Sequence, residues 1–271
     1  MKIALMDSGI GLLAAAAEVR RLRPDADLVL SSDPDSMPWG PRTPQDVTDR
    51  ALAVARAAAD HRPDALIVAC NTASVHALPA LRAALEPGLP VIGTVPAIKP
   101  AAAAGGPVAI WATPATTGSP YQRGLIREFA SAAAVTEVPC PGLADAVQHA
   151  DEAAIDRAVA AAAALTPRDV RAVVLGCTHY ELVAERIRTA LMAVAADRAP
   201  GLPPVVLHGS AWAVAAQALR RIGDRPAPPT PAALPGGGRL TVLLSGRESA
   251  LPTTALAYAE GRELAAITHV G

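Results

Sequence analysis

The 271-residue sequence is poor in aromatic and charged residues, and several features that would reveal a function by composition are missing. Phe, Trp and Tyr together make up 3% of the chain, and charged residues make up 18%. The net charge is only −1, which gives no indication of a nucleic-acid or acidic-membrane surface. No apolar run reaches the length of a membrane span, so we expect no membrane partner. What is left is a globular chain, 51% hydrophobic, with enough residues for one large domain or two small ones.

Cysteine is also scarce, and the three cysteines lie far apart, at Cys70, Cys140 and Cys177. An odd number of distant cysteines argues against a disulfide framework and favours a reducing, cytoplasmic location. The sequence has no CxxC motif and no His pair at ligand spacing, so we expect no structural zinc. It also has no dinucleotide-binding fingerprint, P-loop or convincing pyridoxal-phosphate site, so we expect no bound cofactor.

Short apolar runs alternate with longer amphipathic stretches along the whole chain. The predicted strands are 2–6, 27–30, 65–68, 90–92, 108–111, 172–175, 205–207 and 240–244. The predicted helices are 12–22, 44–61, 75–85, 121–133, 152–165, 182–196 and 211–222. A Pro/Gly-rich stretch, 223–238, predicts a surface loop before a last strand and helix. This alternation predicts an α/β fold in which helices cover parallel sheets.

A faint internal duplication indicates how these elements are grouped. LIVACNTAS at 66–74 resembles VVLGCTHYE at 173–181, and each follows a strand that ends in a small polar loop at a similar distance upstream. We therefore expect two similar α/β domains related by a pseudo-two-fold axis, with the active site in the cleft between them. Residues 1–97 with 208–271 form the first predicted domain, and residues 98–207 form the second.

Cys70 and Cys177 each follow an apolar strand and precede a helix, at the sheet edge where open α/β folds bind ligands. The partial positive charge of a helix N-terminus favours a thiolate there. A single cysteine at such a position is often a buried hydrophobe, but two matched turns favour chemistry. Cys140 lies in a PCPG segment without a helix start, and we assign it to the core. Small polar residues that can cap a helix and bind a carboxylate follow both reactive cysteines: Asn71 and Thr72 in one turn, Thr178 and His179 in the other.

Paired thiols on opposite sides of a substrate suit the inversion of a carbon centre. One group must remove the α-proton from one face while another returns a proton to the opposite face. A thiol, with an ordinary pKa of about 8.5, can exchange these two roles near neutral pH. Asp7, next to Ser8 in a strand-to-turn segment, can orient Cys70, accept its proton or bind an ammonium group, or else merely cap the next helix. His179 can assist Cys177 in the same way.

These motifs resemble the glutamate racemases of the aspartate/glutamate racemase superfamily over nearly the whole chain. The matching segments are DSGIG at 7–11, PWG at 38–40, ACNTAS at 69–74 and GCTHY at 176–180, with looser matches at TPAT (113–116) and YQ (121–122). The resemblance implies a cytoplasmic, cofactor-independent enzyme that interconverts L- and D-glutamate and supplies D-glutamate for peptidoglycan. A homodimer is compatible with it.

The resemblance also implies a role for each matching residue. Cys70, assisted by Asp7, would act on the α-proton of the D-enantiomer, and Cys177, assisted by His179, on that of the L-enantiomer. The implied substrate-binding residues are Ser8, Pro38, Trp39, Gly40, Asn71, Thr72, Thr113, Thr116 and Thr178.

Several positions depart from the pattern of that family. Leu12 stands where a second glycine is usual, Trp39 where tyrosine is usual, and Gly209 where an aspartate is common. Gln148 stands at the place of a glutamate that partners the active-site histidine, and an amide cannot stabilise an imidazolium by charge. Two alternatives therefore stay open. Beside the glutamate racemase, one is a relative that acts on aspartate, a hydantoin or a malonate, and the other is a paralogue whose main role is to bind a ligand or a protein.

Overall fold

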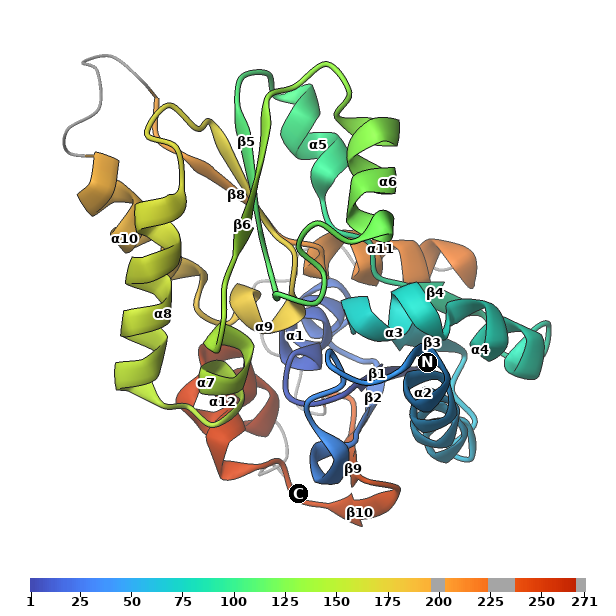
Figure 1. Cartoon of the computed structure of the whole chain (residues 1–271). Helices are drawn as coiled ribbons and strands as arrows, with labels where there is room; N and C mark the ends of the chain where they lie inside the picture. The colour runs from blue at the N-terminus through green and yellow to red at the C-terminus, as the bar shows by residue number, and fades with distance from the viewer. Residues whose placement is uncertain (196–202, 224–236, 267–271) are drawn as a thin grey trace. The chain divides into compact units, whose positions relative to one another are not determined.

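The computed structural model describes residues 1–195, 203–223 and 237–266, and these form two compact units. The first unit contains Met1–Val95 and Ala211–Gly271, and the second contains Pro96–Ser210. Each unit has one sheet whose strands are joined by helices (Figure 1). No described helix is both long enough and apolar enough to cross a membrane.

The sheet of the first unit has six strands in the order β10-β9-β2-β1-β3-β4, and β10 alone among them pairs antiparallel. The strands are β1 (Lys2–Asp7), β2 (Asp27–Ser32), β3 (Ala65–Val68), β4 (Val91–Gly93), β9 (Leu240–Leu244) and β10 (Arg247–Ser249). The α-helices are α1 (Leu12–Leu22), α2 (Pro44–Ala59), α3 (Asn71–His76), α4 (Leu78–Leu85), α11 (Ala211–Arg221) and α12 (Ala259–Ala266). Two 3₁₀ turns, η1 (Pro34–Ser36) and η2 (Thr253–Ala257), complete the described elements.

The core of this unit fills both faces of the sheet, as expected for strands without polar alternation. Ala4 and Met6 of β1 share a buried cluster with Val47 of α2 on one face. Ile3 and Leu5, which alternate with them and point to the opposite face, are equally buried. Both faces of the sheet must be covered for this sequence to fold, which is why helices connect its strands.

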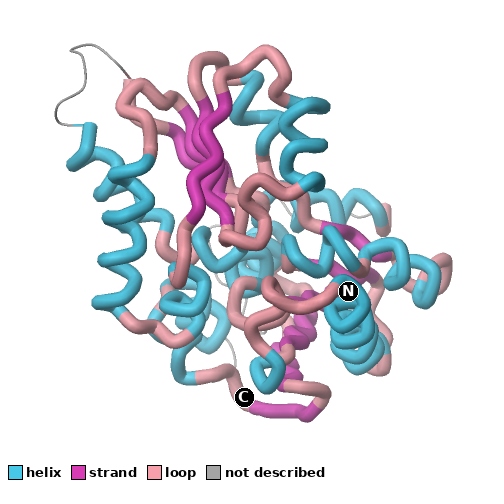
Figure 2. The backbone as a smooth tube through the Cα atoms, viewed as in Figure 1, coloured by secondary structure: helices cyan, strands magenta, loops and turns pink. Residues whose placement is uncertain are grey.

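The sheet of the second unit has four parallel strands in the order β6-β5-β7-β8, shown side by side in Figure 2. The strands are β5 (Val108–Ala112), β6 (Val135–Pro139), β7 (Ala172–Leu175) and β8 (Val206–His208). The helices are α5 (Ile98–Ala103), α6 (Pro120–Phe129), α7 (Leu143–Gln148), α8 (Glu152–Leu165), α9 (Thr178–Glu181) and α10 (Ala184–Ala195). Helices α5 and α6 pack together on one side of the sheet, and α8 and α10 pack together on the other (Figure 1).

The predicted α/β class with parallel sheets is confirmed, but some predicted elements were wrong. The single helix predicted at 75–85 is two helices, because α3 already begins at Asn71 and ends before Ala77, and Pro79 starts the next helix. The helix predicted at 121–133 ends at Phe129, and an unpredicted strand, β6, follows it. Strand β10 was not predicted either. Most of the predicted loop at 223–238, and the last residue of the helix predicted at 182–196, lie outside the described residues.

Candidate active site

Asp7 and Cys70 leave the first sheet at the same edge, because β1 and β3 are parallel neighbours. Met6 pairs with Val68, and the Ala69 N–H donates to the Met6 carbonyl at 2.8 Å. Asp7 is completely buried, and its Oδ1 accepts hydrogen bonds from the N–H of Ser8 at 2.6 Å and from its hydroxyl at 3.2 Å. The carboxylate is therefore held in one orientation at the carboxyl edge of the sheet.

The surroundings of Cys70 favour the protonated thiol. Burial raises the pKa of Cys70 well above its usual range, and the negative charge of Asp7 and a hydrogen bond to its carboxylate raise it further. Backbone N–H groups of Ala73 and Ser8 lower the pKa of Cys70 but do not offset burial and the charge of Asp7. Cys70 is thus a thiol paired with a carboxylate that can accept its proton.

The two cysteine turns have almost the same backbone conformation. Cys70 has φ −136° and ψ 119°, and Cys177 has φ −139° and ψ 135°. Each is an extended residue directly before a helix, so the N–H groups of the first helical turn point towards the sheet edge. The predicted substrate residues at these helix starts are Asn71 and Thr178, both buried, and Thr72, which is half-buried.

A polar cluster after β2 fixes the segment that carries the Pro-Trp-Gly motif. The buried Asp33 carboxylate accepts hydrogen bonds from the hydroxyls of Ser36 and Ser245, the latter at 3.1 Å. Arg42 donates to the Ser36 carbonyl through Nε at 2.9 Å and through Nη2 at 2.6 Å. Residues 37–40 are therefore anchored at both ends, by η1 on one side and by Arg42 on the other.

Trp39 is buried in the same hydrophobic cluster as Cys70, with 1% of its surface exposed. Its indole N–H has no hydrogen-bond partner among the described residues. The neighbouring Pro38 is exposed and Gly40 is half-buried. The structure thus brings the side chain of Trp39, but not that of Pro38, into the buried surroundings of Cys70, and it leaves one buried donor without an acceptor.

In the second unit, the Cys177 turn lies tightly against the end of β5. The Gly176 N–H donates to the Trp111 carbonyl at 2.7 Å, and a side chain at Gly176 would come within 2.7 Å of that same oxygen. The loop after β5 carries Thr113 and Thr116, and the Thr113 hydroxyl donates to the Thr116 hydroxyl at 3.2 Å. Both predicted threonines are thus at the carboxyl edge of the sheet, next to the strand that leads to Cys177.

His179 lies between Cys177 and Gln148. Its Nδ1 is 4.0 Å from the Cys177 Sγ, and its Nε2 is 3.0 Å from the Gln148 Oε1. The amide oxygen can only accept, so Nε2 carries the hydrogen and the Nδ1 lone pair faces the sulfur. This assignment of the tautomer follows from the hydrogen-bond partners. His179 can therefore accept a proton from the Cys177 thiol.

The charge state of His179 is set by burial. The side chain is 3% exposed, and burial lowers the pKa of His179 to about 4. Gln148, as a neutral amide, orients the ring without supplying a negative charge that would oppose this shift. At neutral pH the structure thus presents a neutral imidazole to Cys177.

Cys140 lies in the core, as its sequence context suggested. It is 1% exposed, and burial raises the pKa of Cys140 to about 12. The Tyr180 hydroxyl donates to the Cys140 carbonyl at 3.4 Å. Glu181, which sequence reasoning did not single out, accepts hydrogen bonds from the N–H and the hydroxyl of Ser210, both at 2.8 Å.

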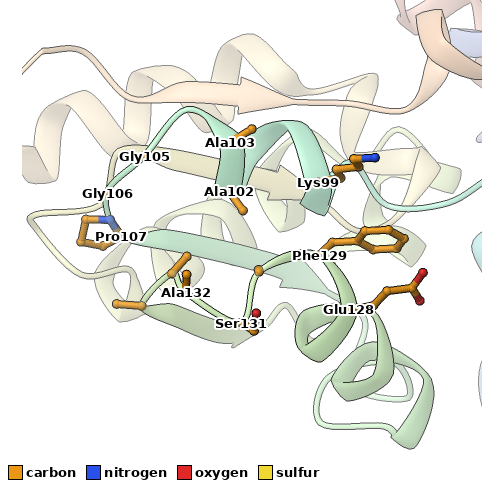
Figure 3. Close-up of a pocket in the computed structure, with 13 residues that line it drawn as sticks. Lys99, Ala102, Ala103, Gly105, Gly106, Pro107, Glu128, Phe129, Ser131 and Ala132 are labelled. Carbon is orange, nitrogen blue, oxygen red and sulfur yellow. The ribbon is translucent and has the colours of Figure 1, made fainter.

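A pocket of about 680 Å³ in the second unit lies away from Cys177. It is lined by small residues around Pro107 and Ala134, which directly precede β5 and β6. In parallel strands the amino-terminal edge is opposite the edge at which Cys177 leaves β7. Figure 3 shows Lys99 near the ring of Phe129 at the rim, 5.9 Å from its centre. We assign no catalytic role to this pocket.

No group of three or more His, Cys, Asp or Glu side chains in residues 1–195, 203–223 and 237–266 is arranged to hold a metal ion.

Comparison with known proteins identifies the relatives of this chain. Residues 11–218 match the Asp/Glu/Hydantoin racemase family. The glutamate racemase of Pseudomonas entomophila is 35% identical over 228 residues, which is 82% of either chain. That of Sphingopyxis alaskensis is 34% identical over 254 residues, 87% of this chain and 94% of the relative.

Two solved structures are similar over nearly the whole chain. Escherichia coli glutamate racemase, in complex with L-glutamate and the activator UDP-MurNAc-ala, has a TM-score of 0.74 at 26% identity, covering 94% of this chain and 91% of that one. Thermus thermophilus glutamate racemase, in complex with beta-chloro-D-alanine, has a TM-score of 0.65 at 29% identity, covering 97% and 92%.

The predicted class of protein, an amino-acid racemase with an α/β fold, is confirmed by these relatives. The chain belongs to the Asp/Glu/Hydantoin racemase family.

Proposed function

We propose that this protein is a glutamate racemase that interconverts L- and D-glutamate without a cofactor, with Cys70 and Cys177 as the two acid/base groups. The observation that carries the proposal is the matched pair of cysteine turns, each with its own proton acceptor beside the sulfur. Asp7 is the acceptor for Cys70, and His179 is the acceptor for Cys177. The names of the relatives, which span most of the chain, support glutamate as the substrate.

In the proposed reaction one cysteine acts as a thiolate and the other as a thiol. The Cys177 thiol first gives its proton to the neutral His179 Nδ1, and the resulting thiolate removes the α-proton of L-glutamate. The Cys70 thiol then donates its proton to the opposite face of the carbanion, giving D-glutamate and a Cys70 thiolate. Exchange with solvent afterwards removes the proton from His179 and returns one to Cys70, which restores both thiols and the neutral imidazole. The reverse reaction begins at Cys70, with Asp7 as the acceptor. No atom is gained or lost, so no redox partner is needed.

In this proposal each charged group of the substrate has a partner among the predicted residues. The N–H groups that start α3 and α9, together with Ser8, Asn71, Thr72 and Thr178, would hold the carboxylates and the ammonium group. The unpartnered indole N–H of Trp39 would donate to the side-chain carboxylate and so replace the hydroxyl of the usual tyrosine. The product, D-glutamate, would serve peptidoglycan synthesis in the cytoplasm.

The test is incubation of the purified protein with L-glutamate in deuterated buffer, without added cofactor. Optical rotation would report racemisation, and NMR would report loss of the Cα–H signal. We expect both signals to change together. Loss of exchange only when pyridoxal phosphate is removed would contradict the cofactor-independent reaction. The same assay with aspartate tests the open alternative that the Trp39 departure selects another acidic substrate.

Cys70→Ser and Cys177→Ser should each abolish racemisation, because each face of the substrate needs its own proton carrier. Cys140→Ala is the matched control, since Cys140 is a buried thiol outside both turns, and it should keep most of the wild-type rate. A Cys70 or Cys177 variant that still interconverts both enantiomers near the wild-type rate would refute the two-base assignment.

A further inference from the structure

The first turn of helix α6 contains a buried glutamine whose side-chain amide has no hydrogen-bond partner within the described part of the chain. Gln122 is 2% exposed, and both its Oε1 and its Nε2 lack a partner. A buried polar group without a partner costs about 1–3 kcal/mol, so native proteins retain very few of them. Such an amide needs a partner, which an ordered water or a ligand can supply.

The position of Gln122 on the helix shows where the amide points. Gln122 shares one helical face with Leu125, Ile126 and Phe129, at spacings of three, four and seven residues. Those three side chains pack against the buried cluster on the sheet of the second unit. The amide is thus the polar end of an otherwise apolar, inward-facing stripe.

The first turn of α6 lies at the carboxyl edge of the sheet. It follows the loop that leaves β5 (Figure 1), and β5 pairs directly with β7, which leads to Cys177. The same loop carries Thr113 and Thr116, and the Thr116 hydroxyl accepts the bond between them and so keeps its own hydrogen for donation. Gln122 and these threonines are on the edge that presents the Cys177 turn.

The start of this helix already has one anionic neighbour. The Ser119 hydroxyl accepts from the Gln122 N–H at 3.1 Å and caps the helix, which has ten residues and no acidic side chain in its first turn. The Glu137 carboxylate accepts from the Gly118 N–H at 2.7 Å, one residue before the cap, and so takes up part of the positive charge of the helix N-terminus. What distinguishes the Gln122 position is therefore its uncommitted amide N–H₂, which a carboxylate can accept from.

We propose that Gln122 is a further substrate-binding residue, which donates its Nε2–H to a carboxylate of a dicarboxylic amino acid while Oε1 accepts from an ordered water. This inference rests on the proposed racemase function and adds a carboxylate contact to it. The YQ pair was a loose match in the sequence, and glutamine at a helix start carries no signal of its own.

The test compares Gln122→Met with wild type. Methionine has a similar length and shape but cannot donate, so we expect kcat/KM for glutamate to fall about 10- to 100-fold, mainly through KM. The melting temperature should stay equal or rise, because an unpartnered buried amide has been removed. Gln122→Glu should lower kcat/KM for glutamate further than Gln122→Met does, since it sets a negative charge against the carboxylate. Gln217→Met, at an exposed glutamine on α11, is the control and should leave KM unchanged.

The possible outcomes separate this inference from the proposed function. Wild-type KM together with a lower melting temperature in Gln122→Met would show that the amide is structural, and would overturn the inference alone. Absence of racemisation by wild type would overturn the proposed function. In that case, thermal stabilisation by glutamate that is present in wild type and lost in Gln122→Met would still support the carboxylate contact. No stabilisation of wild type by glutamate would overturn both.

Discussion

At the scale of single residues, His179 shows how a neutral partner selects one proton-transfer role. Gln148 fixes the ring through Nε2, and burial keeps the imidazole uncharged, so Nδ1 can accept a proton from Cys177. A carboxylate in the place of Gln148 would favour the imidazolium instead, and the same ring would become a stabiliser of the thiolate. The departure at Gln148 thus changes the charge of the pair and keeps its geometry.

Gln148→Glu should therefore raise the pKa of His179 above its value of about 4, because a carboxylate about 3 Å from Nε2 stabilises the charged ring. The measurement is an NMR titration of the imidazole nitrogens. Gln148→Met, which removes the acceptor without adding charge, is the control and should not raise the pKa. An unchanged titration of His179 in Gln148→Glu would contradict the contact between the two side chains.

Part of the residue-scale chemistry was accessible from the sequence, because each cysteine turn is a local motif and the family resemblance pairs it with a partner far along the chain. Asp7 beside Cys70, and Gln148 beside His179, were both expected and are both found in contact. The unpartnered groups of Trp39 and Gln122 were not accessible in this way. Whether a buried N–H finds an acceptor depends on the packing of distant segments, and residue type does not encode it.

At the scale of elements, the two strands that the sequence did not reveal lie at sheet edges. β6 is the outer strand of the second sheet, and β10 is the outer strand of the first. Edge strands face solvent on one side and carry charged or proline residues, here Glu137 and Pro139 in β6 and Arg247 and Glu248 in β10. Without an apolar run they resemble loops. The central strands, buried on both faces, were found because burial requires continuous apolar sequence.

The joint between β7 and α9 gives a prediction at this scale. Gly176→Ala should destabilise the protein by about 1–3 kcal/mol, because the new Cβ would meet the backbone oxygen of Trp111 at 2.7 Å and a backbone cannot easily move away. The displaced turn should also lower the racemase rate through Cys177. Urea unfolding measures the first effect, and the glutamate assay measures the second.

Gly124→Ala is the matched control in the same unit. Gly124 lies inside α6, and its nearest neighbour to a new Cβ is a flexible arginine atom at 4.0 Å. Alanine there should stabilise the helix by about 0.5–1 kcal/mol. Equal stability of the two variants would show that the contact between Gly176 and Trp111 does not constrain the turn.

At the scale of the whole molecule, the buried histidine couples folding to pH. His179 titrates near pH 4 when folded and near 6.5 when unfolded, so between these values the unfolded chain binds more protons. The contribution of His179 to the free energy of unfolding is therefore fully present above pH 6.5. It is lost as the pH falls towards 4, by up to about 3 kcal/mol. His179→Asn should lose this decrease. Denaturant titrations of both proteins from pH 7 to pH 4 would test this prediction. An equal decrease in the free energy of unfolding of wild type and variant would contradict it.

The division into two domains was indicated by the repeated strand-cysteine-helix pattern, but the predicted boundaries at 97/98 and 207/208 stay a prediction. Boundaries are difficult to obtain from sequence, because a connection between units has no periodicity of its own. The first compact unit also consists of two stretches of chain, and its strand β9 pairs with β2, which lies more than two hundred residues earlier.

This pairing has a consequence for the order in which the protein takes shape on the ribosome. Strand β2 emerges early and has no partner on one side until Leu240–Leu244 has been made. The second unit is continuous, so all its strands are available by residue 208, before that partner exists. The nascent chain therefore carries an open, apolar β2 edge while it is being translated, which is the kind of surface that chaperones protect from aggregation.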